Sequence, residues 1–242
     1  MEGFAVTGAR RPVVAVVLAG GAGVRFGGEA PKQLHRLRGR TVLEWAVRAF
    51  VDSDAVDEVV VVVPPAMSAT VRSDLDQMGL VDVAVVDGGV LRSDSTRAAL
   101  AALGDRDCDV LVHDAARPLV DERIIHDCVA ALESAEAVTA AVASTDTVAE
   151  IDDAGHVRAI PERARLRNIQ TPQGCRLATI RQAFALMDAD DGRMADPSDD
   201  CSVVLRYLPE VPIGVVEGSA RNLKLTHPHD LEVAEAVLTG EA

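Results

Sequence analysis

Short apolar runs recur along the first 145 residues, and segments with a helical pattern separate them. The runs are rich in valine or alanine, which is typical of parallel strands that are buried on both faces of a sheet. Strands that alternate with helices at this spacing predict an α/β fold, in which a wound, mostly parallel sheet carries helices on both faces. The expected strands are Val13–Leu18, Glu58–Val63, Val83–Val86, Asp109–Val112 and Ala137–Ala143.

The helices are predicted from apolar periodicity and from their first residues. Thr41 and Glu44 have the spacing of a capping box, so a helix is expected from there through Phe50, with Leu43, Val47 and Phe50 on one side. The other expected elements are helices at Asp94–Leu103, Glu122–Leu132, 177–187 and Leu231–Leu238 and a strand at Val211–Val216.

The alternation weakens between Ser144 and Ile169. Residues 147–151 and 156–160 alternate in polarity around a turn-prone Asp-Asp-Ala-Gly, which predicts a β-hairpin that projects from the sheet. No internal repeat or low-complexity linker is present. We therefore expect residues 1–242 to form a single domain, with a projecting β-hairpin arm at about 144–169.

Composition excludes several classes of protein. Acidic residues outnumber basic ones by 38 to 24, and a formal charge of −14 disfavours binding to nucleic acid or to anionic membranes. The run Val13–Ala19 is too short to span a bilayer, so we expect neither a transmembrane helix nor a signal peptide. The expected location is the cytoplasm. The four cysteines form no C-x-x-C pair, which predicts idle or buried thiols rather than a zinc site or disulfides. The acidic segment Asp188–Asp200 is expected to be a solvated face.

A glycine-rich loop directly follows the first expected strand, in the sequence Leu18-Ala-Gly-Gly-Ala-Gly-Val-Arg25, with Pro31-Lys32 beyond it. Glycines let backbone N–H groups approach phosphate oxygens, and Arg25 and Lys32 would add positive charge. The loop lacks the Gly-Lys-Ser/Thr of a P-loop and the third glycine of a dinucleotide fingerprint. These features favour a nucleoside triphosphate over NAD, and a plain strand-to-helix turn is the alternative.

A second motif, His113-Asp-Ala-Ala-Arg-Pro118, lies at the end of a hydrophobic strand, the edge where ligands bind in open α/β sheets. Asp114 is the candidate ligand for Mg²⁺, directly or through water. Arg117 could instead neutralise Asp114 as a structural ion pair. His113 is expected to be a hydrogen-bonded structural histidine, since no His or Cys partner lies nearby in the sequence.

Two weaker motifs complete the candidate site. Gly88-Gly89 precedes Arg92, Ser93 and Ser95, where backbone amides and a hydroxyl could contact a nucleobase or its sugar. The alternative is that a Ser or Asp there simply caps a helix. Lys224 lies between two leucines, which indicates that its ammonium faces a polar pocket; a surface lysine with a buried stem is the alternative.

Taken together, these motifs resemble the 2-C-methyl-D-erythritol 4-phosphate cytidylyltransferase family of the non-mevalonate isoprenoid pathway. The resemblance runs from about Val13 to Leu238 and includes Thr171-Pro-Gln173 and Asn222-Leu-Lys224. It implies a Rossmann-like nucleotidyltransferase fold and an enzyme that joins CTP to methylerythritol phosphate and releases pyrophosphate. The substrate phosphate would attack the α-phosphorus directly, so catalysis would rest on positioning and charge stabilisation.

The resemblance also implies roles for individual residues. The catalytic residues would be Arg25, Lys32, Arg163 and Lys224. Substrates would be bound by Ala19, Gly20, Gly21, Gly23, Gly88, Gly89, Ser95, Asp114, Ala115, Arg117, Thr147 and Thr171, with Asp114 near Mg²⁺. Arg165 and Arg167 share the register of Arg163 and are alternatives to it. The family is a homodimer, so Thr147 and Arg163 on the arm would serve the neighbouring subunit's site.

Two other functions remain open at this point. A cytidylyltransferase for ribitol 5-phosphate would share the fold and the glycine loop. A non-catalytic nucleotide-binding sensor would keep the fold without needing Arg25, Lys32 and Lys224, since a sensor has no transition state to stabilise.

Overall fold

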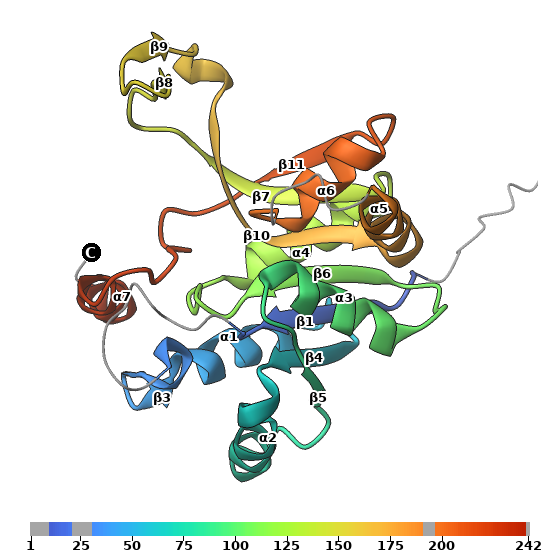
Figure 1. The fold of residues 1–242 in the computed structure, drawn as a ribbon. Helices are drawn as coiled ribbons and strands as arrows, with labels where there is room; N and C mark the ends of the chain where they lie inside the picture. Colours follow the sequence, from blue (N-terminus) through green and yellow to red (C-terminus); the bar gives the residue numbers. More distant parts are fainter. Residues whose placement is uncertain (1–9, 21–30, 191–196, 241–242) are drawn as a thin grey trace, which may run out of the picture.

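A seven-stranded sheet runs through the part of the chain that the structure, a computed structural model, describes: residues 10–20, 31–190 and 197–240 (Figure 1). Its strand order is β11-β7-β10-β6-β1-β4-β5. The strands are β1 (Val13–Leu18), β4 (Glu58–Val63), β5 (Ala84–Asp87), β6 (Asp109–Asp114), β7 (Ala137–Ala143), β10 (Arg167–Arg176) and β11 (Ile213–Glu217). The helices are α1 (Val42–Val51), α2 (Ser68–Gln77), α3 (Arg92–Leu103), α4 (Glu122–Leu132), α5 (Leu177–Ala189), α6 (Asp200–Tyr207) and α7 (His229–Thr239).

The sheet is mostly parallel and has helices on both faces, as predicted. Along β1, Val13, Ala15 and Val17 pack in one core with α1, α2 and α4, whereas Val14 and Val16 pack in a second core with α3, α5 and α6. Every residue of β1 is buried, which explains why this strand has no polar alternation. The predicted α/β class with a mostly parallel sheet is confirmed.

Strand β10 is antiparallel to both of its neighbours, β6 and β7, and the sequence analysis did not find it. Its buried stretch contains Gln170, Thr171 and Gln173, so it has no continuous apolar run. These polar side chains are buried because they form hydrogen bonds inside the fold. A strand of this kind cannot be recognised from hydrophobicity.

Helix α1 begins as its sequence predicts. The Thr41 hydroxyl accepts a hydrogen bond from the backbone N–H of Glu44 at 3.0 Å, and the buried side includes Leu43, Val47 and Phe50. Beside it, the short hairpin of β2 (Arg36–Leu37) and β3 (Arg40–Thr41) packs against α7, where Leu37 and Ala234 share a small apolar cluster. This packing brings the end of the chain to the carboxyl edge of the sheet.

The predicted arm projects beyond the sheet as a short hairpin of β8 (Glu150–Ile151) and β9 (Val157–Ala159) (Figure 1). The Asp152 carboxylate accepts hydrogen bonds from the backbone N–H groups of Ala154 and His156, which fixes the turn. The arm is shorter at its base than predicted, because residues 167–169 pair with β7 as part of β10. Residues 144–166 therefore form the arm.

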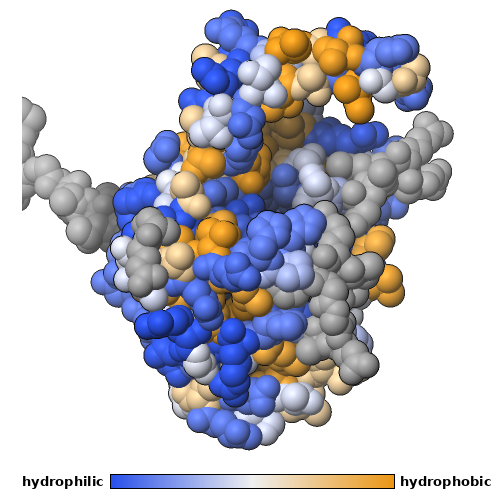
Figure 2. Space-filling model, turned by 90° about the vertical axis from the view of Figure 1, so that its left-hand side faces the viewer, coloured by the Kyte–Doolittle hydropathy of each residue, from blue (hydrophilic) through white to orange (hydrophobic). Residues whose placement is uncertain are grey.

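Apolar side chains on the arm are exposed, and they appear as orange patches at the top of Figure 2. They are Val148, Ile151, Val157 and Ile160, with exposed fractions from 42% to 68%. Exposed apolar side chains that gather on one projecting element mark a candidate contact surface.

All four cysteines are buried free thiols, in line with the prediction. Among the described residues, no helix is both long enough and apolar enough to cross a membrane.

Candidate active site

A cavity of about 310 Å³ lies where β1 and β6 end. Its walls come from the ends of these strands, the turn at Lys32–Leu34, the start of α3 and the loop before α7. Seven of the predicted site residues line it: Ala19, Gly20, Lys32, Ser95, Asp114, Ala115 and Lys224. A larger cavity of about 470 Å³ between α1 and α7 contains none of them, so we place the candidate site in the smaller cavity.

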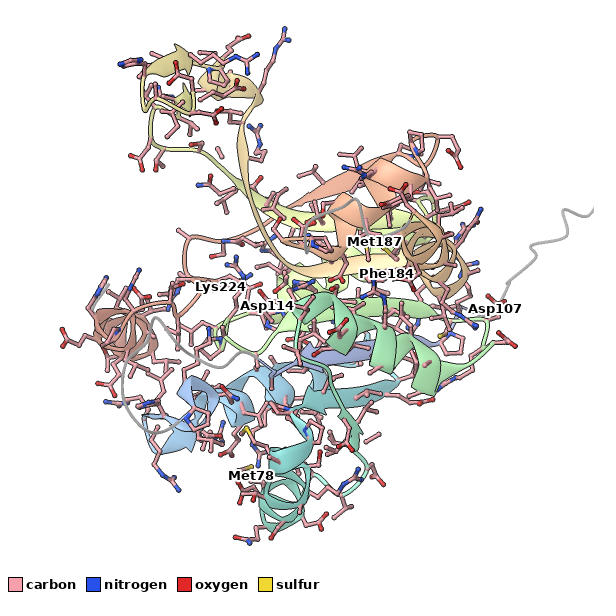
Figure 3. All side chains as sticks on the ribbon, in the orientation of Figure 1. Met78, Asp107, Asp114, Phe184, Met187 and Lys224 are labelled. Carbon is pink, nitrogen blue, oxygen red and sulfur yellow. The ribbon has the colours of Figure 1, made fainter. Side chains whose placement is uncertain are left out.

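Asp114 is held between two cations at the end of β6. Its Oδ1 accepts a hydrogen bond from Arg92 Nε at 3.1 Å, and its Oδ2 lies 2.6 Å from Lys224 Nζ (Figure 3). Burial raises the pKa of this carboxyl group, but Arg92 and then Lys224 lower it more strongly, so the net pKa is below its ordinary value and Asp114 is ionised. The alternative that Arg117 neutralises Asp114 is wrong, because Arg92 and Lys224 do so.

Arg92 also reaches Asp200, whose Oδ2 lies 2.8 Å from Arg92 Nη2. Burial lowers the pKa of the guanidinium, but Asp200 and Asp114 together raise it above its ordinary value. The solvated face predicted for the acidic segment is therefore wrong for Asp200, which is 1% exposed and also accepts a hydrogen bond from the Thr96 hydroxyl. A detectable signal was Asp199, which caps α6 through Ser202 N–H and marks a helix start at Asp200.

The chain has two lysines, Lys32 and Lys224, and both line this cavity. Lys32 Nζ donates to the Leu225 carbonyl at 3.3 Å, and Lys224 pairs with Asp114. The polar-pocket interpretation of Lys224 is therefore the right one. With Arg92 beside them, the described lining carries three cations against the single carboxylate of Asp114, in a protein of charge −14. The cavity favours an anionic ligand.

Behind Asp114, a buried chain of hydrogen bonds fixes the motif. The Thr171 hydroxyl accepts from the Asp114 backbone N–H at 3.1 Å and pairs with His113 Nδ1 at 3.0 Å, while His113 Nε2 meets the Arg117 carbonyl at 3.0 Å. Burial lowers the pKa of His113 to about 4, so the ring is neutral and Nε2 is the nitrogen that donates. His113 is thus the structural histidine that was predicted. Thr171 holds Asp114 from behind and does not line the cavity.

The glycines have a packing reason that the sequence analysis did not foresee. A Cβ on Gly88 would lie 2.7 Å from the Ser95 hydroxyl oxygen, and one on Gly20 would lie 3.1 Å from the same atom. Ser95 therefore sits against glycine on both sides while it faces the cavity. The helix-cap alternative is also partly right, because Asp94 Oδ2 accepts from Leu91 N–H at the start of α3.

The other predicted site residues fall into three groups. Gly21, Gly23 and Arg25 fall outside the described residues. Four others are not part of the described lining of the cavity. They are Gly88, Gly89, Arg117 and Thr171. Thr147 and Arg163 are exposed on the arm, where the Arg163 guanidinium donates to the Thr145 carbonyl and Arg165 pairs with Glu162. A single chain does not bring the arm residues to this cavity.

The oxygen ligands that Asp114 offers fit a divalent cation that is already bound to an anionic ligand. Both carboxylate oxygens already face cations, but each keeps a lone pair that a metal-bound water could use. Elsewhere in the described chain, Asp54, Glu122 and His126 have ligand atoms within 4.8 Å of one another, on an exposed surface that shares no residue with the cavity.

Comparison with known proteins identifies the family. The sequence model of 2-C-methyl-D-erythritol 4-phosphate cytidylyltransferase matches residues 13–240. The chain belongs to this family. Like the other members of this cytidylyltransferase family, it is therefore a nucleotidyltransferase.

A curated family member from Thermobifida fusca is 50% identical over 242 residues, which cover 96% of each chain. The solved structure of 4-diphosphocytidyl-2C-methyl-D-erythritol synthase from Anaerococcus prevotii superposes with a TM-score of 0.80 at 28% identity, covering 95% of this chain and 99% of that one. A bifunctional ribulose 5-phosphate reductase/CDP-ribitol pyrophosphorylase from Haemophilus influenzae is 34% identical over 92% of this chain but only 47% of its own length. These likenesses confirm the predicted family and nucleotidyltransferase fold.

Proposed function

We propose that this protein transfers CMP from CTP to 2-C-methyl-D-erythritol 4-phosphate. An oxygen of the substrate phosphate forms a bond to the α-phosphorus of CTP, the bond from that phosphorus to the β-phosphate oxygen breaks, and pyrophosphate leaves. The observation that carries the proposal is the placement of both lysines of the chain, with Arg92, around Asp114 at the carboxyl edge of the sheet. Family membership supplies the identity of the substrates.

The roles of the residues follow from this chemistry. Lys32 and Arg25 would stabilise the charge that develops on the α-phosphate, since no protein nucleophile is needed. Lys224 and Arg163 would hold the methylerythritol phosphate in line. Ser95 and the backbone of Gly88, Gly89, Ala19, Gly20, Gly21, Gly23 and Ala115 would bind CTP, and Arg117 and Thr171 would act through the hydrogen bonds that hold Asp114 and its loop.

Asp114 would hold Mg²⁺ as the ion enters with the triphosphate. The ion would neutralise part of the triphosphate charge, while Arg92 keeps Asp114 ionised and in place. Activity should vanish in EDTA and return when Mg²⁺ is added. Turnover in metal-free buffer would contradict this role.

We further propose a cytoplasmic homodimer in which each arm reaches the partner's cavity. The exposed apolar side chains of the arm support an interface there, and Thr147 and Arg163 would complete the neighbouring site. Lys32→Ala and Arg163→Ala proteins, each inactive alone, should regain activity when mixed as heterodimers, because one site then keeps both residues. Verified heterodimers without activity would exclude a shared site.

The decisive experiment measures pyrophosphate release with CTP and Mg²⁺ in the presence of methylerythritol 4-phosphate or ribitol 5-phosphate, with the other nucleoside triphosphates as controls. Turnover with methylerythritol phosphate and CTP is expected. Turnover with ribitol phosphate alone would keep the mechanism and change the substrate. CTP binding without any pyrophosphate release would indicate the sensor.

A further inference from the structure

The loop at 218–225, between β11 and α7, is tied to the sheet by two buried amide side chains, Gln170 and Asn222. Gln170 is 6% exposed and Asn222 is fully buried. Neither residue lines the cavity, and the mechanism above uses neither of them.

The Gln170 side-chain amide both donates hydrogen bonds to the start of this loop and accepts them from it. Its Nε2 donates to the Ser219 carbonyl at 2.8 Å, and its Oε1 accepts from Ser219 N–H at 3.2 Å and from Asn222 Nδ2 at 3.3 Å. A Cβ on Gly218 would lie 2.4 Å from the same Oε1 and 3.2 Å from the Ala141 backbone, so a side chain there would force Gln170 out of these hydrogen bonds. These contacts fix the start of the loop against the Gln170 side chain.

Asn222 joins this end of the loop to the Asp114 motif. The Asn222 Nδ2 also donates to the Thr171 backbone carbonyl at 2.9 Å, and the Asn222 backbone carbonyl accepts from Arg117 Nη1 at 2.8 Å. Thr171 in turn holds the backbone of Asp114. The loop and the carboxylate are thus fixed against the same short stretch of β10.

The part of the loop that follows carries the contacts of both lysines. Lys224 pairs with Asp114, and the Leu225 carbonyl accepts from Lys32 Nζ. The Leu225 N–H is fixed to the Ala116 carbonyl at 2.8 Å. A shift of the backbone at Asn222 would therefore move one ammonium group directly and the acceptor of the other.

We infer that Gln170 and Asn222 are positioning residues, which set where the Lys224 ammonium stands relative to Asp114 and to the alcohol phosphate. Only the kinetic consequence of this inference rests on the proposed function. The position of the Lys224 ammonium is a property of the free protein and does not depend on the reaction. Neutral amides suit this role because they offer donors and acceptors together without adding a charge beside the cations of the cavity.

The first test removes the Asn222 side chain and measures binding and catalysis separately. In Asn222→Ala, kcat/KM for the alcohol phosphate should fall about 10- to 100-fold, as expected for a misplaced positioning group, while the Kd of CTP changes less than about twofold. Thr179→Ala is the control. Thr179 is also buried, with 6% exposed, and its hydroxyl donates to a Glu136 carboxylate oxygen at 2.7 Å, but neither residue lines the cavity. This variant should lose stability without the loss in kcat/KM.

A second test needs no turnover. Limiting reductive methylation, followed by peptide mass spectrometry, gives the reactivity of each lysine relative to the α-amine. In the wild-type protein Lys224 should react slowly because its ammonium is paired with Asp114 at 2.6 Å, and in Asn222→Ala its relative reactivity should rise several-fold. If the wild-type protein is inactive but Asn222→Ala still shows this rise, the proposed function is refuted and the positioning role is supported.

The variant Gln170→Glu covers the case in which Asn222→Ala fails to fold. A protonated glutamic acid can still donate to the Ser219 carbonyl, whereas a carboxylate repels it. The variant should therefore lose kcat/KM as the pH rises through the range where this carboxyl ionises, and the wild-type protein should not. Unchanged Lys224 reactivity in Asn222→Ala, equal kinetic losses in Thr179→Ala, or a Gln170→Glu profile parallel to wild type would each overturn the inference.

Discussion

The buried ion pair between Asp200 and Arg92 offers a sharp test of the electrostatics of the site. In Asp200→Asn the amide oxygen can still accept from the Thr96 hydroxyl, and an uncharged NH2 group replaces the carboxylate oxygen that faces Arg92. Breaking a buried pair from one side typically costs about 3–5 kcal/mol. Because Arg92 keeps Asp114 as a second counter-ion, we expect the lower end, about 3 kcal/mol.

For a chain of this length each kcal/mol lowers the Tm by about 2–4 °C, so the expected loss is about 6–12 °C. Asp188→Asn is the matched control, since Asp188 makes the same kind of pair with Arg97 of the same helix α3. The carboxylate of Asp188 is 52% exposed, and surface pairs contribute about 0.2–1 kcal/mol, so the Tm of this variant should fall by about 4 °C or less. Both values can be read from calorimetry or from urea unfolding.

Equal small losses in the two variants would refute the reasoning, because they would show that the Asp200 charge is not needed to balance a buried Arg92. A large loss in both would also refute it, since the exposed pair would then be worth as much as the buried one.

Three further outcomes are expected. Lys32→Ala should lower kcat by about 10²–10³ in steady-state assays, the usual cost of removing one group that stabilises transition-state charge, and an unchanged kcat would exclude Lys32 from the mechanism. The pKa of His113 is about 4 in the folded state, below its value in the unfolded chain, so the unfolded chain takes up the proton first as the pH falls. About 3 kcal/mol of stability should therefore be present above pH 6.5 and be lost as the pH falls to 4. Urea unfolding of His113→Asn should lack this loss, and a parallel pH profile would contradict the assignment. Gly88→Ala should cost about 1–3 kcal/mol and weaken CTP binding measured by calorimetry, because its Cβ would lie 2.7 Å from Ser95 Oγ and 2.9 Å from Val62 Cγ1; normal stability and affinity would show that the backbone yields there.

The parts of the fold that follow from hydrophobic burial could be predicted from the sequence. Strands such as Val13–Leu18 and Glu58–Val63 are buried on both faces, so their composition alone identifies them. The start of α1 was predictable because Thr41 and Glu44 form a local hydrogen bond, which needs no other part of the chain.

What escaped prediction depends on partners far apart in the sequence. β10 is recognisable as a strand only when the hydrogen-bond partners of Gln170 and Gln173 are known. Asp200 looks like one of many surface acids until Arg92, more than a hundred residues earlier, is placed beside it. Local patterns cannot report pairings of this kind. Three predicted site residues of the glycine loop, Gly21, Gly23 and Arg25, lie outside the described residues, so their predicted roles stay predictions.

The way in which the arm is rooted in the sheet has a thermodynamic consequence. The arm leaves at the end of β7 and returns along β10, which pairs with β7 through Arg167–Ile169, then breaks register and reaches Gln170 and Thr171. The strand on which the arm returns to the sheet therefore also carries Gln170 and Thr171, which support Lys224 and Asp114. If the arms join two chains, association and substrate binding must be linked, and linkage is reciprocal: whatever factor dimerisation adds to substrate affinity, bound substrate adds to the affinity of the chains for each other.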